Sequence, residues 1–232
     1  MDFKKELLEL NISLTKKMED RFSLYYERLV ETNEKMNLTA ITEKNEVYCK
    51  HFLDSLEITR AIDCDKKMTL CDVGSGAGFP SIPLAIVNDN CEVTIIDALN
   101  KRINFLNDLV KELELENVIA LHKRAEDFAK EKREYFDLVT ARAVARLNIL
   151  VELCLPLTKL GGKMIAMKGS SGLEEVEEAQ KAIQVLGGTI EKTITVELPE
   201  GMGKREIIII KKIKNTPSKY PRSFAKIKER PI

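Results

Sequence analysis

The sequence predicts an α/β fold of the Rossmann-like kind, in which a mostly parallel sheet is covered by helices and preceded by a helical extension. From Thr69 onward, short apolar runs alternate with helical segments, as in βαβ units. The first run ends in three alternating glycines, and the last two runs are joined by a connection too short for a helix. These observations indicate five parallel strands followed by an antiparallel hairpin.

Residues 1–65 are predicted to form the helical extension, packed on the core. One helix carries apolar side chains at spacings of three and four residues, namely Met18, Phe22, Tyr25, Tyr26, Leu29 and Val30. A second helical stretch is expected to start near Asn45 and carries Tyr48, Phe52, Leu53 and Leu56. No β pattern precedes Thr69.

Residues 66–214 are predicted to form the sheet domain. The candidate strands are Thr69–Val73, Glu92–Asp97, Val118–Leu121, Phe136–Thr140, Lys163–Met167, Thr189–Leu198 and Glu206–Ile213. Only seven residues, 199–205, join the last two, so these should pair as a hairpin at the sheet edge. A seven-stranded sheet with such a final hairpin is typical of class I methyltransferases, whereas dehydrogenases usually continue with another βα crossover.

Composition excludes several classes of protein. The chain of 232 residues is 44% hydrophobic and 32% charged, and no apolar run approaches the roughly 20 residues that span a bilayer. The N-terminus lacks the apolar region of a secretory signal. The five cysteines are odd in number and never form a C-x-x-C pair, which argues against disulfide frameworks and zinc sites. We therefore expect a cytoplasmic monomer that binds neither membrane nor metal.

Charge is distributed unevenly along the chain. The 37 basic and 37 acidic residues cancel, but residues 204–232 contain ten Lys and Arg against two Glu, a net charge of about +8. Clustered basic residues bind phosphates. Residues 215–232 are thus interpreted as a basic C-terminal tail that contacts a polyanion, the alternative being a disordered tail that aids solubility.

The glycine-rich turn carries the clearest functional signal. Gly74, Gly76 and Gly78 follow an apolar strand and precede a helix, where backbone can approach a ligand and unpaired N–H groups are available. Asp97 ends the next strand nineteen residues beyond Gly78, at a position where an acid can bind ribose hydroxyls.

The spacing of the glycines favours S-adenosylmethionine over a dinucleotide. Dinucleotide sites require G-x-G-x-x-G, whereas here the third glycine comes one residue early and Phe79 and Pro80 follow it. A second element, Ala125-Glu126, lies just after the third strand, where methyltransferases of this fold commonly place an acid against adenine. The alternative interpretation of Glu126 is a residue that suits the helix dipole.

The sequence at the end of the fourth strand limits which chemical groups are expected to accept the methyl group. It lacks the Asn/Asp-Pro-Pro-Tyr/Phe sequence common in methylation of exocyclic amines, so an amino acceptor is not favoured. No cysteine stands in the setting needed for attack on pyrimidine C5, because Cys154 lies in an apolar helix and is interpreted as a core residue.

Several segments together closely resemble the bacterial small-subunit (16S) ribosomal RNA guanine-N7 methyltransferases, once named glucose-inhibited division protein B. They are Met36–Ile41, His51–Leu56, Asp72–Leu84, Asn100–Arg102, Thr140–Ala145 and Lys219–Arg222. The resemblance covers nearly the whole chain. It implies donor-binding roles for Gly74, Phe79, Ala125, Glu126 and Arg142. Ala98 replaces a common serine, and the C-terminal sequence matches the family's usual ending only loosely.

Guanine N7 suits a site without an obvious acid or base, since its lone pair is available at neutral pH. Alignment of N7 with the sulfonium methyl is then the main source of acceleration. We assign positioning roles to Arg142, between donor and RNA, and to Lys168, on phosphate or guanine O6. His51 and Asp54 lie three residues apart on a predicted helix and are interpreted as holding the extension to the core rather than as a catalytic pair.

The sequence alone leaves two alternative functions open. The chain could methylate another RNA, such as transfer RNA, or it could be a non-catalytic ribosome-assembly factor that binds the donor. Donor turnover on purified small subunits separates them.

Overall fold

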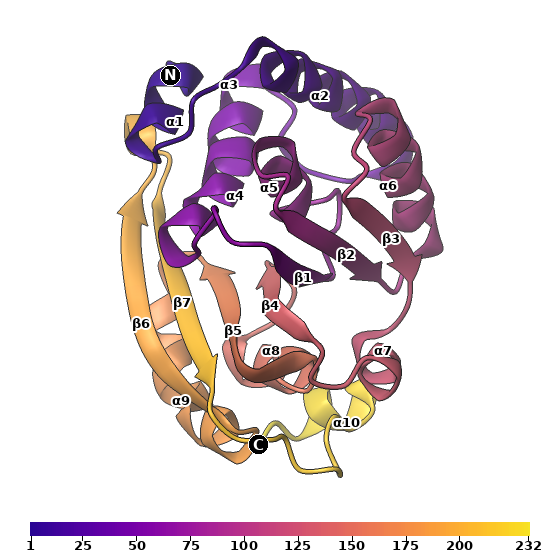
Figure 1. Cartoon of the computed structure of the whole chain (residues 1–232), viewed down its shortest axis with the longest axis vertical. Coiled ribbons are helices and arrows are strands. Elements are labelled where there is room, and N and C mark those ends of the chain that lie inside the picture. The colour runs from indigo at the N-terminus through magenta and orange to yellow at the C-terminus, as the bar shows by residue number, and fades with distance from the viewer.

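A computed structural model describes residues 1–232 and contains one seven-stranded sheet (Figure 1). Its strand order is β3-β2-β1-β4-β5-β7-β6. The strands are β1 Met68–Val73, β2 Cys91–Asp97, β3 Val118–His122, β4 Phe136–Arg142, β5 Thr158–Lys168, β6 Gly188–Glu197 and β7 Lys204–Lys212. β1 to β5 pair in parallel, whereas β7 pairs antiparallel with both β5 and β6. The predicted fold class, with its final hairpin, is confirmed.

Helices cover both faces of the sheet (Figure 1). One buried cluster joins the N-terminal helices to α5 and α6, and a second joins α7 to α10 on the other face. The helices between strands are α5 Ser81–Val87, α6 Asn100–Glu112, α7 Ala125–Glu131, α8 Leu147–Cys154, α9 Gly172–Val185 and η3 Pro199–Gly201, followed by α10 Phe224–Glu229. No helix in the fold is both long and apolar enough to cross a membrane.

The N-terminal helices are α1 Phe3–Glu9, α2 Lys16–Met36, α3 Lys44–Val47, η1 Tyr48–Leu53, α4 Asp54–Leu56 and η2 Glu57–Ala61. The predicted face of α2 packs inward, with Phe22, Tyr25 and Leu29 fully buried. The Tyr25 hydroxyl donates to the Ala77 carbonyl at 2.6 Å, which ties α2 to the glycine-rich turn. The second predicted stretch is helical but contains a π-helical segment, η1, that apolar spacing does not reveal.

β5 begins five residues before the predicted start at Lys163. Phe136 pairs with Thr158, and the register then shifts before Leu138 pairs with Lys163. At Gly162 a side chain would lie 2.7 Å from the Asp137 carbonyl oxygen. The close approach of the two strands explains why glycine interrupts the apolar run without ending the strand.

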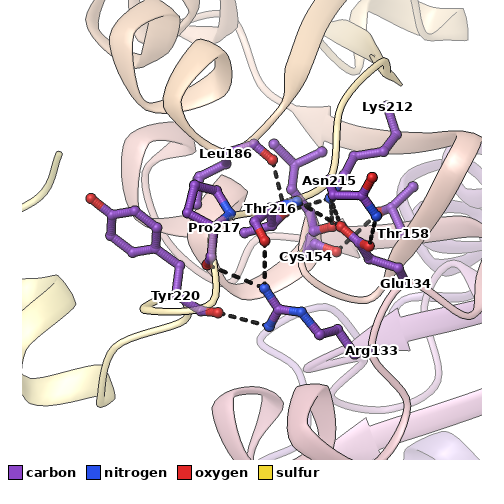
Figure 2. A network of polar contacts seen from close by, with 11 residues as sticks. Arg133, Glu134, Cys154, Thr158, Leu186, Lys212, Asn215, Thr216, Pro217 and Tyr220 are labelled. Atoms are coloured by element: carbon purple, nitrogen blue, oxygen red, sulfur yellow. Dashed lines mark hydrogen bonds and ion pairs between the residues drawn. The ribbon is translucent and has the colours of Figure 1, made fainter.

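Residues 215–232 pack against the sheet domain (Figure 2). The Arg133 guanidinium donates to the carbonyls of Thr216 and Tyr220, at 2.6 and 2.8 Å. Glu134 accepts from the Thr216 backbone and lies 3.1 Å from the buried Lys212 ammonium. Further along, Arg222 pairs with the fully buried Glu152 at 2.6 Å, and Ile227 on α10 is fully buried. The segment therefore has its own anchors on α8 and on the turn between α7 and β4.

Candidate active site

The three glycines of the turn after β1 have positive φ values of 72°, 63° and 105°, yet their surroundings differ. A side chain at Gly74 would lie 2.9 Å from Val144, and one at Gly78 would lie 2.6 Å from Ile82. At Gly76 nothing lies within 4 Å of the missing Cβ. Gly78 is therefore explained by packing against α5, whereas Gly76 borders open space that a ligand can enter.

Asp97 lies at the end of β2, beside this turn. Its carboxylate accepts from the Gly76 N–H at 3.3 Å and the Leu99 N–H at 2.9 Å, and the Arg102 guanidinium lies 3.3 Å away. The residue is only 4% exposed. A buried carboxylate that already orders the turn is placed where the sequence predicts contact with ribose hydroxyls.

Two polar atoms in β1 and the turn that follows it are buried without a hydrogen-bond partner. They are Oδ1 of Asp72, in the strand, and Oγ of Ser75, in the turn. The other oxygen of Asp72 accepts from the Ser81 hydroxyl at 2.6 Å, and burial raises the pKa of Asp72 to about 7. Orphaned buried polar atoms cost free energy unless a ligand or water completes them. They fit a polar ligand at this turn. Neither residue is among the site residues predicted from sequence, although an acid two residues before the first glycine is a signal that could have indicated Asp72.

Phe79 is 4% exposed and forms part of an aromatic stack. Its ring lies 5.4 Å from the Tyr25 ring and 4.6 Å from the His51 ring, nearly parallel to both. The Arg142 guanidinium lies over it at 4.9 Å. The ring of Phe79 thus joins the N-terminal extension to the turn and supports Arg142.

Arg142 ends β4 and is fixed by the N-terminal extension. Its Nη1 donates to Asp54 Oδ2 at 2.9 Å and to the Lys50 carbonyl at 3.1 Å, while Nη2 lies 3.2 Å from His51 Nδ1. Asp54 Oδ2 also lies 3.1 Å from Arg205 Nε on β7. His51 and Asp54 therefore hold the helical extension to the core, as predicted, and they do so through Arg142.

A cavity of about 510 Å³ opens beside Arg142, at the carboxyl ends of β4 and β5. Its polar lining includes His51, Asp54, Arg142, Lys168, Glu175 and Arg205. A larger cavity, of about 1330 Å³, lies along β3 and the amino ends of the strands and contains none of the predicted site residues. Ligands of open α/β sheets bind at the carboxyl ends of the strands, so we place the site at the smaller cavity.

Lys168, at the end of β5, is 8% exposed and already paired. Its ammonium donates to the Ala145 carbonyl and lies 2.8 Å from Glu175 Oε2. The same Glu175 oxygen accepts from the Leu147 N–H at 2.7 Å. Together Lys168 and Glu175 hold the loop between β4 and α8, in which Ala143 has a left-handed φ of 54°.

Ala125 and Glu126 form the first turn of α7, next to the carboxyl end of β3. Glu126 Oε1 accepts from the Phe224 N–H at 3.3 Å, so the start of α10 lies against this predicted donor contact. The donor residues proposed from sequence thus stand on successive loops at the carboxyl ends of β1 to β4, and Lys168 follows on β5.

Side chains for thiolate or metal chemistry do not gather here. Cys154 is fully buried, as expected of a core residue, and burial raises its pKa well above the ordinary value. No three His, Cys, Asp or Glu side chains lie together in an arrangement suited to a metal ion. The polar groups of the site are instead backbone N–H groups, carboxylates and guanidinium ions, together with the His51 imidazole and the Lys168 ammonium.

Comparisons with known proteins agree on a family. The family model described as rRNA small subunit methyltransferase G matches residues 18–207. "Ribosomal RNA small subunit methyltransferase G" of Staphylococcus saprophyticus is 58% identical over 212 residues, covering 91% of this chain and 89% of the relative. The protein of the same name from Staphylococcus aureus is 55% identical over 218 residues, covering 94% of this chain and 91% of the relative.

Solved structures share the fold at low identity. TrmN from Thermus thermophilus has a TM-score of 0.55 and 16% identity, covering 70% of this chain and 49% of the other. The 16S rRNA (adenine(1408)-N(1))-methyltransferase of Catenulisporales acidiphilia, solved with its cosubstrate SAM, has a TM-score of 0.53 and 12% identity, covering 67% and 94%. The structural likeness establishes the methyltransferase fold, and the sequence matches establish that the chain belongs to the rRNA small subunit methyltransferase G family.

Proposed function

We propose that the chain transfers a methyl group from S-adenosylmethionine to N7 of a guanine in small-subunit (16S) ribosomal RNA. In a member of this family, Gly76 opens onto free space beside the buried Asp97 carboxylate. Gly74 of the same turn lies against Val144, which lines the polar cavity at the ends of β4 and β5, and this proximity supports the proposal. A donor at the turn and a base in the cavity would be neighbours.

Donor binding is assigned to residues on four adjacent loops. The backbone around Gly74, Gly76 and Gly78 would face the methionine portion, Asp97 the ribose hydroxyls, and Ala125 with Glu126 the adenine. Phe79 and Arg142 would close the site from the side of the extension. These roles follow from the resemblance and from the location of each residue at the carboxyl ends of the strands.

We add Asp72 to this set. Its buried, unpartnered Oδ1 lies in the strand that leads into the turn, and the methionine portion of the donor carries an ammonium group. A carboxylate in that location would bind the ammonium by a charge-assisted hydrogen bond. The same argument gives Ser75 Oγ a ligand-facing role, because it too is buried and unpartnered.

Methyl transfer to guanine N7 requires the protein mainly to position the donor and the base. The bound donor supplies an electrophilic methyl group. Guanine N7 offers a lone pair at neutral pH, so no side chain has to remove a proton and no metal is required. The chain must hold the base so that N7 points at the methyl carbon, which is worth several orders of magnitude in rate.

Arg142 and Lys168 are the proposed positioning groups at the cavity. Arg142 is held on three sides, so it would meet the base or an adjacent phosphate without rearrangement. Lys168 is bound to Ala145 and Glu175, so contact with guanine O6 or a phosphate would have to replace one of these partners. Its main contribution is then to order the loop after β4.

Membership of the family supports a ribosomal RNA substrate. We propose small-subunit RNA or its ribosomal particle as the partner, a monomeric protein, and a cytoplasmic location. We propose that the chain is divided into three parts. Residues 1–65 form a helical extension, residues 66–214 form the methyltransferase domain, and residues 215–232 form a basic segment that contacts RNA. The exposed Lys219, Lys226, Lys228 and Arg230 would supply that contact.

The direct test is methyl transfer in solution. Purified chain is incubated with labelled donor and with small subunits from cells that lack the modification, and the RNA is digested to nucleosides. We expect label only in 7-methylguanosine. Deproteinised RNA and transfer RNA serve as parallel acceptors. Label on transfer RNA alone would favour the alternative substrate, and donor binding without transfer to any RNA would favour a non-catalytic assembly factor.

A further inference from the structure

His51 occupies an unusual position between the N-terminal extension and the end of β4. It lies within the π-helical segment η1, and its ring stacks on Phe79 with the two planes 21° apart. One ring nitrogen, Nδ1, lies 3.2 Å from Arg142 Nη2. The other, Nε2, lies 2.8 Å from the Thr39 hydroxyl. The imidazole therefore has a defined partner at each nitrogen.

The partners define which nitrogen carries the proton. A guanidinium only donates hydrogen bonds, so the Nδ1 that faces Arg142 must present its lone pair. The proton then lies on Nε2, which donates to the Thr39 hydroxyl. Nδ1 is also 3.1 Å from the Lys50 carbonyl, whose two lone pairs can accept from Arg142 Nη1 and from a second donor. A proton on Nδ1 would nevertheless point at the donor hydrogens of Arg142, which favours the tautomer with its proton on Nε2.

The Thr39 end of this connection is itself anchored. Thr39 N–H donates to Asn33 Oδ1 at 2.8 Å, and its hydroxyl accepts from the Ile41 N–H at 3.0 Å. Asn33 belongs to the last turns of α2, which ends at Asn37 in the left-handed region. Hydrogen bonds therefore run without interruption from α2 through Thr39 and His51 to Arg142.

The neutral state of the ring matters for the reaction. Arg142, Lys50 and Arg205 act on His51 from β4, η1 and β7. Asp54 is the carboxylate paired with Arg142 and Arg205, and Glu46 is the one paired with Lys50. Burial and these cations lower the pKa of His51 to about 4. A protonated ring would lose its acceptor and place another cation beside a guanine that becomes positively charged at N7. A neutral ring orients Arg142 without adding charge.

We propose that Thr39 and His51 are positioning residues for methyl transfer, which set the plane of the Arg142 guanidinium through a neutral imidazole protonated at Nε2. Asp54 and the Lys50 carbonyl hold one nitrogen of Arg142, and His51 holds the other, so the plane is defined only when all three are present. The inference rests on the proposed role of Arg142 at the acceptor cavity.

The first test separates hydrogen bonding from packing. His51→Phe keeps an aromatic ring for the stack on Phe79 but removes both nitrogens. His51→Asn restores an acceptor near the place of Nδ1, and Thr39→Val removes the hydroxyl with little change of shape. Thr189→Val, at an exposed threonine on β6 away from the site, is the control. Methylation of small subunits is measured at saturating donor, with thermal unfolding recorded for each variant.

We expect His51→Phe to lower kcat by about 10- to 100-fold and Thr39→Val by about 3- to 10-fold, because small misplacements of a positioning group are costly. The KM for RNA should change by less than about threefold, and His51→Asn should recover a substantial part of kcat. A His51→Phe enzyme with the wild-type kcat would overturn the proposal. So would a His51→Asn enzyme no better than His51→Phe, since the loss would then come from packing.

The second test does not depend on the methylation assay. The chain has only two histidines, so the ring nitrogens of His51 and His122 can be assigned by nitrogen-15 NMR of the full protein. We expect His51 Nδ1 to show the chemical shift of an unprotonated nitrogen and Nε2 that of a protonated one, unchanged from pH 8 to pH 5.5. A proton on Nδ1, or a ring that titrates above pH 6, would overturn the inference even if N7 methylation is confirmed. If the tautomer is as expected but no 7-methylguanosine forms, the proposed function fails instead.

Discussion

The two halves of the candidate site differ in how far their polar groups are paired within the protein. On the donor side, the turn after β1 leaves Asp72 Oδ1 and Ser75 Oγ buried and unpartnered, and Gly76 borders open space. On the acceptor side, the charged groups bind one another: Arg142 with Asp54, and Lys168 with Glu175. The donor half leaves two buried polar atoms that a ligand can complete. In the acceptor half each of these charged groups has an ionic partner, and one carboxylate oxygen, Asp54 Oδ1, is buried without a hydrogen bond.

This contrast indicates how each half should respond to change. An unpartnered buried polar atom costs about 1–3 kcal/mol, which a bound ligand can recover, so the donor half should lose mainly ligand affinity when altered. A buried ion pair that loses one member leaves the other uncompensated. The acceptor half should therefore lose folding stability as well as rate.

The largest expected effect lies at Gly76. We expect Gly76→Arg to abolish S-adenosylmethionine binding in calorimetry, because the side chain would fill the open space beside Asp97. Gly161→Arg is a matched control, since Gly161 also has a positive φ, of 81°, and open space around its missing Cβ, but lies on an exposed part of β5. Unchanged donor affinity in Gly76→Arg would place the donor elsewhere.

Asp54 tests the acceptor half. Asp54→Asn should lower the free energy of unfolding by about 2–4 kcal/mol, because the partly buried Arg142 and Arg205 would lose their shared, buried carboxylate. Chemical denaturation measures the loss, and kcat should fall with it. A variant as stable as the wild type would mean that water already solvates these guanidinium ions well. The expected difference between the two halves, loss of stability against loss of ligand affinity, would then not hold.

Asp97→Ala should weaken donor binding by about 1–3 kcal/mol, through loss of charge-assisted hydrogen bonds to the ribose. Because Asp97 also orders the turn through Gly76 and Leu99, Asp97→Asn is the better-matched variant and should lose less. Calorimetry at fixed pH gives both values. Wild-type affinity in the two variants would show that the ribose lies outside the reach of Asp97.

Donor affinity should also depend on pH through Asp72. Its pKa is raised to about 7 by burial, so the carboxylate that would bind the donor ammonium forms only above that pH. Affinity should fall by up to about tenfold from pH 8 to pH 6 and stay flat in Asp72→Asn. The sign for folding is opposite: because the folded-state pKa lies above the ordinary value, Asp72 makes the protein less stable as pH rises from about 4 to 7. A flat wild-type binding profile would remove Asp72 from the donor site.

The smallest effect is expected on the C-terminal segment. Lys226→Gln together with Lys228→Gln should flatten the salt dependence of RNA binding by about one to two charges and leave donor affinity unchanged. Both lysines are exposed on α10, whereas cutting the segment off would unpair the buried Glu152 and uncover Ile227. An unaltered salt slope would show that α10 does not contact RNA.

The sequence predicts the fold well because its signals are local. Apolar runs define the strands, and a seven-residue connection between the last two leaves room only for a hairpin. The location of Asp97, Glu126 and Arg142 then follows, since the carboxyl ends of parallel strands share one edge of the sheet.

Other features depend on contacts between residues far apart in the chain. Arg142 and Asp54 are 88 positions apart, and no local pattern indicates that they pair. The three glycines look equivalent in sequence, and only the neighbours of each missing Cβ distinguish Gly76 from Gly78. Residues 215–232 are anchored on Arg133 and Glu152, which lie far away in the chain. The charge of the segment alone therefore does not predict these contacts.

Mapping of the modified base in cellular RNA is the decisive measurement for methylation of guanine N7. N7 lies in the deep, narrow major groove of A-form RNA, so the target guanine should be unpaired or extruded. Reduction by borohydride followed by aniline cleaves RNA at 7-methylguanosine. Cells without this protein should lose one such cleavage in small-subunit RNA and regain it with the wild-type gene but not with Gly76→Arg. Cleavage that persists without the protein, or label placed by the purified enzyme on an exocyclic amine or a ribose hydroxyl, would contradict the account.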